Sequence, residues 1–253
     1  MKQDARYTLV TGSSRGIGRA IAEELAREGH VVAVHGSKDS DPLREAYRSV
    51  RGFSPRSIRL TGDLAEPKDI ERMFAEIRKE FGRLDVLVNN AAMQNPGPFL
   101  EMRLEDWDRI MAVNLRAAFL CGQHAGRMMR DQGGGKMVNI SSVHDTAPRR
   151  HYAHYSSAKG GLHMLTQCMA LELAEYNIQV NSVTAGGVAT ELTDPGREAS
   201  LLSSIPAGRI AQPAEVAKLV SYLVSPAADY VTGSAVRIDG GLLLGFCATR
   251  KDL

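Results

Sequence analysis

The sequence predicts an α/β fold with a seven-stranded parallel sheet covered by helices on both faces. Two observations support this prediction. Short β-rich apolar segments alternate along the chain with longer segments whose apolar residues recur at helical spacing. Several of the β-rich segments, such as VVAV and the VLV of DVLV, are continuously apolar rather than apolar at every second residue, which is typical of strands buried on both faces of a parallel sheet. A doubly wound α/β domain is therefore expected.

The expected elements follow one another without an internal repeat or a linker. The first helix covers 17–29, where Ile17, Ile21 and Leu25 share one face and Gly29 ends the pattern. The other helices are expected near 68–81, 104–130, 155–176 and 213–224. The seven expected strands are YTLV (7–10), VVAV (31–34), SIRL (57–60), DVLV (85–88), MVNI (137–140), IQVNSV (178–183) and AVRI (235–238). Because α/β folds of 253 residues routinely form one domain, residues 1–253 are expected to form a single domain.

One long stretch, 186–212, is irregular and rich in Gly, Pro, Ser and Thr. It lies between the sixth strand and the helix near 213, where a lid over a substrate is expected. Composition alone is equally compatible with an ordinary surface loop.

Composition and charge exclude several classes of protein. The chain is 43% hydrophobic and 24% charged with a formal net charge of +2, and its acidic and basic residues are interspersed. No basic block suited to nucleic acid is present, and no apolar run is long enough to span a bilayer or to act as a signal region. The three cysteines are far apart in sequence and fit neither a disulfide framework nor a metal site. A cytoplasmic enzyme or binding protein without a metal is expected.

The first turn of the chain carries a signal for a dinucleotide. TGSSRGIG (11–18) directly follows the first strand and opens the first helix. Gly12 permits the tight turn, Gly16 lets the backbone approach a diphosphate, and Gly18 lets the helix pack closely on the strand. The free N–H groups at the helix N-terminus favour the anion. This context predicts a Rossmann-type site, although a purely structural glycine turn remains the alternative.

The chain resembles the short-chain dehydrogenase/reductase family through motifs that occur in the family's order. The G-x-x-x-G-x-G spacing is the first of them. The others are NNAA (89–92), Asn114, the NISS run that ends at Ser142, a Y-x-x-x-K pair at Tyr155 and Lys159, NSVTAGGVAT (181–190) and DGG (239–241). The resemblance extends from residue 7 to residue 241. It implies an enzyme that transfers a hydride between NAD(P) and a secondary alcohol or carbonyl.

The catalytic residues implied by this resemblance are Asn114, Ser142, Tyr155 and Lys159. A free phenol has a pKa of about 10, which is too high for an efficient base at neutral pH. Four residues apart on a helix, Tyr155 and Lys159 share one face, so the ammonium is expected to favour the phenolate and lower its pKa. Ser142, at the carboxyl end of a strand, can donate to the substrate oxygen. The resemblance adds that Lys159 binds the nicotinamide ribose and that Asn114 supports a water relay behind it.

The second strand is followed by residues that favour NADP over NAD. No carboxylate appears at the expected position until Asp39, whereas Ser37, Lys38 and Arg15 can surround a 2′-phosphate. The alternative is that Asp39 or Asp41 binds the ribose of NAD, and dual use is also compatible with the sequence. The expected cofactor-binding residues are Gly12, Ser14, Arg15, Gly16, Ile17, Gly18, Ser37, Lys38, Asp63, Leu64, Asn90, Ala91, Tyr155, Lys159, Gly186, Val188 and Thr190. The adenine contact of Asp63 is implied by the resemblance, and a helix N-cap is its alternative.

The substrate is less well defined than the cofactor. SSVH (141–144) and the insert before Tyr155 look like the bacterial glucose 1-dehydrogenase branch, in which a histidine at the position of His144 lies beside the sugar. The expected substrate contacts are Ser142, His144, Tyr155, Gln94 and Gly187. Arg149 and Arg150 can recognise a phosphorylated or carboxylated substrate, but a solvated pair of loop charges is the simpler interpretation.

Two other functions remain open. A 3-oxoacyl-(acyl carrier protein) reductase has the same fold and catalytic groups, although the acidic segment ELAEYN (172–177) does not favour docking of an acyl carrier. A non-catalytic NADP-sensing protein is a more distant alternative, because Tyr155, Lys159 and Ser142 are all retained.

Two residues depart from the family pattern, and one helix suggests assembly. Ala92 replaces the glycine of Asn-Asn-Ala-Gly, and Ala185 replaces the proline before Gly186. Relatives pair the helices holding Asn114 and Tyr155 and often form tetramers. A homotetramer is therefore expected, and the apolar residues Met164, Leu165, Cys168, Met169 and Leu171 fit such a contact. A wide core face is the alternative.

Overall fold

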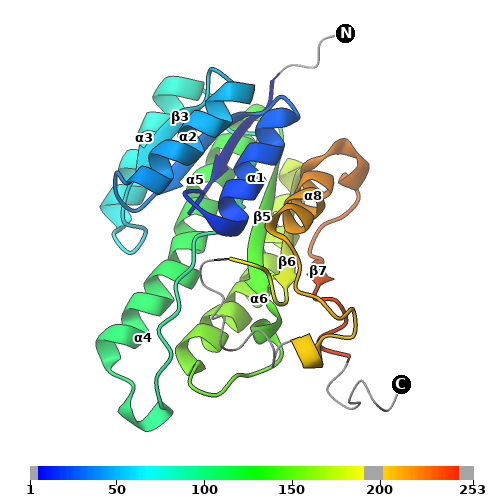
Figure 1. Ribbon diagram of the computed structural model, residues 1–253. Helices are drawn as coiled ribbons and strands as arrows, with labels where there is room; N and C mark the ends of the chain where they lie inside the picture. Colours follow the sequence, from blue (N-terminus) through cyan, green and yellow to red (C-terminus); the bar gives the residue numbers. More distant parts are fainter. Residues whose placement is uncertain (1–4, 191–201, 245–253) are drawn as a thin grey trace.

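The computed structural model describes residues 5–190 and 202–244. Figure 1 shows a twisted sheet between two layers of helices. The sheet has seven strands in the order β3-β2-β1-β4-β5-β6-β7, and every neighbouring pair is parallel. The predicted α/β fold, a Rossmann-type parallel sheet with helices on both faces, is confirmed.

All seven strands overlap the segments predicted from the sequence. They are β1 (Tyr7–Val10), β2 (Val31–Gly36), β3 (Ile58–Thr61), β4 (Val86–Asn89), β5 (Gly135–Ser142), β6 (Ile178–Ala185) and β7 (Ala235–Ile238). The helices are α1 (Gly16–Arg27), α2 (Asp41–Phe53), α3 (Pro67–Phe81), α4 (Leu104–Met111), α5 (Ala117–Gln132), α6 (Ala153–Leu173) and α8 (Pro213–Val224).

Helices cover both faces of the sheet. Successive strand residues point to opposite faces, so an apolar strand exposes apolar side chains on each face unless helices bury them. Val10 of β1 belongs to a core shared with α1, α2 and α8. Its neighbour Leu9 belongs to the core on the other face, shared with α3, α5 and α6. Both side chains are fully buried, so the continuous apolar pattern of the strands has the predicted cause.

Two helices differ from the sequence prediction. α2 was not predicted, because only Leu43, Ala46 and Val50 of its thirteen residues are buried and the remainder is strongly charged. The helix expected over 104–130 is interrupted by a π-helical turn, Ala112–Arg116, which separates α4 from α5. A π-turn inserts one residue into the helix and leaves no periodic signal in a continuous run of helix formers.

The strand order places the functional segments at one edge of the sheet. β1 lies between β2 and β4, so the chain winds in opposite directions on either side of the β1–β4 pair. Ligands bind at such a switch point, outside the carboxyl ends of the strands. The glycine turn follows β1, and NNAA (89–92) begins at the last residue of β4. Ser142 and Ala185 end β5 and β6 and are paired in register.

The segment predicted as a lid is only partly described, because 191–201 lies outside the described residues. Its two flanks contact each other: Ala189 N donates to Ala211 O over 2.8 Å, and Ala211 N donates to Gly187 O over 3.0 Å. The lid itself remains a prediction.

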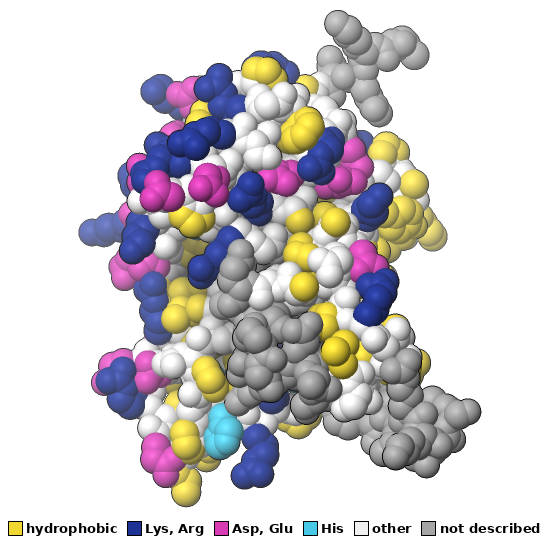
Figure 2. Space-filling view, in the orientation of Figure 1, with side chains coloured by type: hydrophobic (Ala, Val, Ile, Leu, Met, Phe, Trp, Pro, Cys, Tyr) yellow, Lys and Arg dark blue, Asp and Glu magenta, His cyan; other side chains and the backbone are white. Residues whose placement is uncertain are grey.

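The surface follows the charge pattern of the sequence. Figure 2 shows acidic and basic side chains interspersed on the face in view. No helix in the described ranges is long and apolar enough to cross a membrane.

Candidate active site

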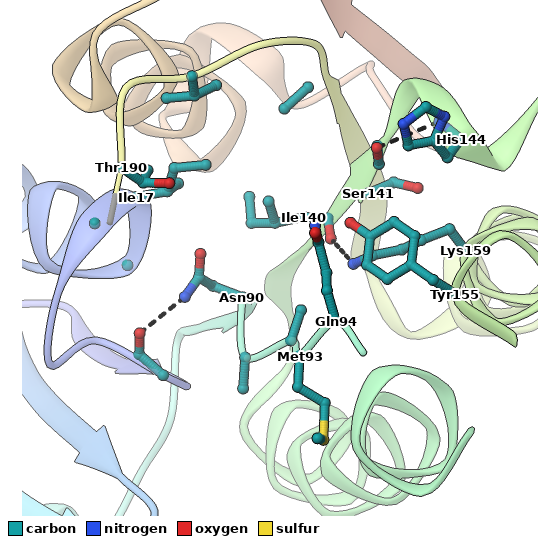
Figure 3. A pocket seen from close by; sticks show the side chains of 18 of the residues that line it. Ile17, Asn90, Met93, Gln94, Ile140, Ser141, His144, Tyr155, Lys159 and Thr190 are labelled. Atoms are coloured by element: carbon teal, nitrogen blue, oxygen red, sulfur yellow. Dashed lines mark hydrogen bonds between the residues drawn. The ribbon is translucent and has the colours of Figure 1, made fainter. Parts of the chain in front are cut away.

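The carboxyl ends of the strands line a cavity of about 1050 Å³. This volume suits a ligand larger than most small substrates. Nearly all of the predicted site residues line it. They are Gly12, Ser14, Arg15, Gly16, Ile17, Gly18, Ser37, Asp63, Leu64, Asn90, Ala91, Gln94, Ser142, His144, Tyr155, Lys159, Gly186, Gly187, Val188 and Thr190. Figure 3 shows Ile17, Asn90 and Thr190 at one end and Tyr155, Lys159 and His144 at the other.

The glycine turn at the first end fits a diphosphate. The α1 helix begins at Gly16 without a side-chain cap and without an acidic residue in its first turn, so its N-terminal N–H groups are open to an anion. Gly12 and Gly16 have left-handed φ angles of 62° and 54°. A Cβ at Gly18 would collide with the backbone oxygen of Gly12 and the amide of Asn90. The three glycines therefore fit the roles expected of them.

His35, which sequence reasoning missed, holds this turn from behind. Its Nδ1 accepts from Gly12 N over 3.0 Å, and its Nε2 donates to Gly62 O over 3.0 Å. An imidazole that accepts at one nitrogen and donates at the other is neutral. Burial lowers the pKa of His35 to about 4, so the ring stays neutral at physiological pH.

The carboxylates that follow β2 and β3 are already paired. Asp39 makes ion pairs with Arg44 and Arg59, each over 2.9 Å. Asp63 lines the cavity, pairs with Arg109 over 2.8 Å and accepts from Ala65 N over 3.0 Å. Asp63 is not the N-cap of the following helix, because α3 begins at Pro67 with Glu66 at the N-cap position; its contact with adenine remains a prediction.

The Tyr155, Lys159 and Ser142 side chains meet at the other end. Tyr155 and Lys159 both lie on α6, are buried, and point toward the end of β5. Lys159 Nζ donates to Ile140 O over 2.7 Å and lies 5.7 Å from the centroid of the Tyr155 ring. The cation therefore lies against the phenol, as the four-residue spacing predicts.

The pKa values differ from one expectation. Burial raises the pKa of the Tyr155 phenol, and hydrogen bonding with Ser142 and Gln94 only partly opposes this. Burial also lowers the pKa of Lys159 to about 8, while the Asp145 carboxylate acts in the opposite direction. The predicted lowering of the phenol pKa is wrong for this structure, because desolvation outweighs the favourable interactions.

The chain is similar to known proteins over nearly its whole length. Residues 12–243 match the family model described as enoyl-(acyl carrier protein) reductase. A 3-oxoacyl-[acyl-carrier-protein] reductase of Synechocystis sp. is 35% identical over 95% of this chain and 98% of its own length. An acetoin dehydrogenase of Salmonella typhimurium superposes with a TM-score of 0.90 at 35% identity, over 97% of this chain and 99% of its own. A short-chain type dehydrogenase/reductase of Mycobacterium marinum gives a TM-score of 0.90 at 35% identity, over 96% of both chains.

The chain belongs to the short-chain dehydrogenase/reductase family. It is therefore an oxidoreductase, and the family uses NAD(P) cofactors.

Three rings lie together at the Tyr155 end of the cavity in this short-chain dehydrogenase/reductase. The ring centroids of His144, Tyr152 and Tyr155 are 6.1 to 6.4 Å apart. His144 Nδ1 lies 3.0 Å from Ala147 O, and burial lowers the pKa of the imidazole. Sequence reasoning missed Tyr152, although it precedes Tyr155 by three residues, which is one helical turn.

Two predicted residues, Lys38 and Asn114, do not line the cavity. Lys38 is exposed and has no ion pair within the described ranges. Asn114 lies in the π-turn, where its amide accepts from Met93 N over 2.9 Å and donates to Met93 O over 3.0 Å. Asn114 and Lys159 also border a small separate cavity of about 10 Å³, close to the lower limit for one water molecule. The water relay remains a prediction.

The two departures from the family pattern cause no backbone strain. Among the described residues other than glycine, only His151 and Asn177 have positive φ, so Ala92 is not forced into the left-handed region. Ala185 ends β6 in register with Ser142 of β5 and Ile238 of β7. Alanine therefore continues the sheet where the family has proline.

A buried carboxylate, Asp145, acts electrostatically on Lys159 and was also missed. Its side chain is 1% exposed, and its Oδ2 accepts from Ser141 Oγ over 2.9 Å and from Thr184 Oγ1 over 3.0 Å. It lies 3.8 Å from Nδ1 of His163. No group of three or more His, Cys, Asp or Glu side chains in the described part of the chain could hold a metal ion.

Proposed function

We propose that this enzyme transfers a hydride between NADP and a secondary alcohol or carbonyl of a small polar molecule, a sugar or polyol, in the manner of a glucose 1-dehydrogenase. The observation that supports this most directly is the convergence of Tyr155, Ser142, Gln94 and His144 at one end of a cavity whose other end is the glycine turn. Hydrogen-bonding side chains around the reacting group suit a hydroxylated substrate better than an acyl chain.

The chemistry assigned to the catalytic side chains follows from their positions. A bound nicotinamide would supply the hydride acceptor or donor. The Tyr155 hydroxyl gives a proton to the carbonyl oxygen or takes one from the alcohol, and Ser142 donates a hydrogen bond to the same oxygen. The Lys159 ammonium favours the phenolate whenever Tyr155 has lost its proton. Burial raises the pKa of the phenol, so Tyr155 holds its proton at neutral pH and can give it to a carbonyl oxygen; in the reverse reaction the same oxygen takes the proton from the alcohol.

His144 can select a hydroxyl group. Since its Nδ1 faces the Ala147 carbonyl oxygen, the proton is assigned to Nδ1, which leaves Nε2 as an acceptor. Burial lowers the pKa of the ring and so maintains this neutral form. A substrate hydroxyl donating to Nε2 would be held beside Tyr155.

The preference for NADP is supported by the residues at the adenosine end. Asp39 is occupied by Arg44 and Arg59, so no free carboxylate is available there for a ribose hydroxyl. Arg15 lines the cavity and has no ion pair within the described ranges, so it can pair with a 2′-phosphate. Steady-state kinetics should give a lower KM for NADP than for NAD, and Arg15→Gln should reduce that difference. Equal KM values in the unmodified enzyme would contradict the preference.

A second candidate, 3-oxoacyl-(acyl carrier protein) reduction, is supported by the Synechocystis relative. Docking of an acyl carrier favours basic residues beside the site, but Arg130 near the end of α5 is paired with Asp131 over 2.8 Å, and the segment 172–177 after the catalytic residues of α6 is acidic. A non-catalytic NADP sensor is not supported, because the chain belongs to a family of oxidoreductases and retains Tyr155 and Lys159.

One panel of assays separates the candidates. NADP reduction is measured with free sugars and polyols, and NADPH oxidation is measured with acetoacetyl-CoA as the thioester. Turnover of a sugar or polyol without thioester reduction supports the proposal. Reduction of the thioester alone would replace it with the second candidate.

We also propose a homotetrameric assembly. Met164 and Leu171 on α6 are 57% and 83% exposed, and Phe119 on α5 is 42% exposed. Such apolar exposure on two neighbouring helices is more compatible with a contact between copies than with a wide core face. A cytoplasmic location, a single domain over 1–253 and a lid within 186–212 also remain predictions.

A further inference from the structure

One cation at the substrate end has no role in the chemistry above. Arg149 lines the cavity beside His144, Tyr152 and Tyr155. Asp63 is the one acidic residue among the described residues that line this cavity, and it is already paired with Arg109. Arg149 itself has no ion pair within the described ranges. The nearby Asp145 carboxylate is buried and accepts from Ser141 and Thr184, so the Arg149 guanidinium has no carboxylate partner among the described residues.

The Arg149 side chain is held in place by an aromatic ring. Its Cζ lies 4.3 Å from the centroid of the Tyr152 ring, and the Tyr152 and Tyr155 centroids are 6.1 Å apart. Stacking on a ring face orients a guanidinium and leaves the N–H groups along its edges available to an oxyanion. The charge reaches the reacting groups, because it acts to lower the pKa of both Tyr155 and His144.

The backbone around Arg149 is also fixed. Tyr152 N donates to Arg149 O over 3.2 Å, which closes a tight turn with Arg150 and His151 at its centre. His151 has a φ of 69°, a left-handed conformation that is unfavourable for a residue with a side chain. Gly97 N holds it by donating to His151 O over 2.9 Å. Strained conformations that the surroundings enforce are frequent at ligand sites.

We propose that Arg149 binds an anionic oxyacid group on the substrate, so that the enzyme acts on hydroxy or keto acids, or on phosphorylated polyols, in preference to neutral alcohols. This inference rests on the proposed function and narrows its substrate class. A carboxylate or phosphate oxygen pairs with the guanidinium edge in a charge-assisted, bidentate contact. The reacting carbon of the same molecule then lies between Arg149 and the Tyr155 hydroxyl.

Matched substrates test the inference. One set has a common six-carbon chain: D-sorbitol, D-gluconate and sorbitol 6-phosphate. A shorter set pairs 2,3-butanediol with 3-hydroxybutyrate. In at least one set the anionic member is expected to have a kcat/KM about tenfold above that of its neutral counterpart, mainly through KM. The gluconate and phosphate arms distinguish the two sources of anionic oxygen.

Variants of two neighbouring arginines test whether Arg149 causes the preference for anionic substrates. Arg149→Gln is expected to lower the anionic-to-neutral ratio of kcat/KM by about 10- to 100-fold, the effect of losing a charged hydrogen-bonded pair. Arg150→Gln is the matched control, since Arg150 is exposed and does not line the cavity. It is expected to leave the ratio unchanged. If Arg149→Gln does not fold, Arg149→Lys keeps the charge without the planar fork and should lower the ratio less severely.

The failures of the two proposals are distinguishable. Turnover of a neutral polyol with no preference for its acid or phosphate would overturn the role of Arg149 and leave the proposed function intact. An equal change of ratio in the Arg149 and Arg150 variants would do the same. Reduction of acetoacetyl-CoA with no turnover in either set would overturn both proposals.

Discussion

The Lys159 ammonium lies 5.7 Å from the centroid of the Tyr155 ring, and both side chains are buried one helical turn apart on α6. This arrangement places a cation where the proposed chemistry needs it, but it also removes that cation from water. Burial lowers the pKa of Lys159 to about 8 and raises that of Tyr155. The buried Lys159 charge therefore lowers the free energy of unfolding, so substitutions at this pair change stability as well as activity.

Lys159→Met is expected to stabilise the fold while abolishing most activity. The folded pKa of Lys159, about 8, lies below its usual 10.5, so the buried charge destabilises the fold at neutral pH. Each pKa unit corresponds to about 1.4 kcal/mol, and the unpaired Ile140 carbonyl left in the variant offsets part of the gain. A net stabilisation of about 1 kcal/mol at pH 7 should be measurable by urea unfolding.

The pH dependence of that difference is its most specific feature. The penalty is fully present below pH 8 and disappears as pH rises from 8 toward 10.5, so the two proteins should converge over that window. Lys218→Met, at an exposed position on α8, serves as the control. A Lys159→Met protein less stable than the unmodified chain at pH 7 would contradict the account.

Asp145→Asn is expected to shift the pH profile of kcat. Its carboxylate raises the pKa of Lys159, so removing the charge should lower that pKa further. Activity that depends on the ammonium should then decline at a lower pH than in the unmodified enzyme. Ser141→Ala removes one hydrogen bond to Asp145 and keeps the charge, so its profile should not move. Identical pH profiles for Asp145→Asn and the unmodified enzyme would show that Asp145 does not control the protonation of Lys159.

The fold is expected to lose stability in mild acid. His30 and His35 are buried with folded pKa values of about 4, below the usual 6.5. As pH falls, the histidines of the unfolded chain are protonated before those of the folded chain. The stability that depends on neutral His30 and His35 is therefore complete above pH 6.5 and is lost as pH falls toward 4. Urea unfolding should show a decrease of about 2 to 4 kcal/mol between pH 7 and pH 5.

The His35→Asn variant measures how much of this loss of stability in acid comes from His35. Asn at position 35 offers an acceptor to Gly12 N without a titrating ring, so His35→Asn should have about half the pH dependence. An unchanged slope between pH 7 and 5 would show that other groups control acid unfolding.

Much of the fold could be predicted because its signals are local. The five inner strands are buried on both faces, and Gly12, Gly16 and Gly18 have conformations or contacts that a larger residue would disturb. The α2 helix was missed because its few buried residues are separated by charged ones. The π-turn at Asn114 has no periodic signature at all.

The candidate site could be predicted where its residues lie on one helix and local spacing brings them together. Tyr155 and Lys159 meet because helical spacing requires it. The contributions of His35 and Asp145 depend on groups far away in the sequence: Gly62 for the first and Thr184 for the second. The direction of the Tyr155 pKa shift was missed for a related reason, since burial is a property of the whole fold.

The most direct test is the turnover of Tyr155→Phe on the best substrate of the panel, with Tyr222→Phe, a half-exposed position on α8, as the control. Phenylalanine preserves the ring and removes only the hydroxyl that carries the proton. A general acid at this position requires a fall in kcat of about 10²- to 10⁴-fold, with unchanged binding of NADPH by fluorescence titration. A kcat within about threefold of the unmodified enzyme would contradict it, because general acid catalysis by this phenol would then contribute almost nothing.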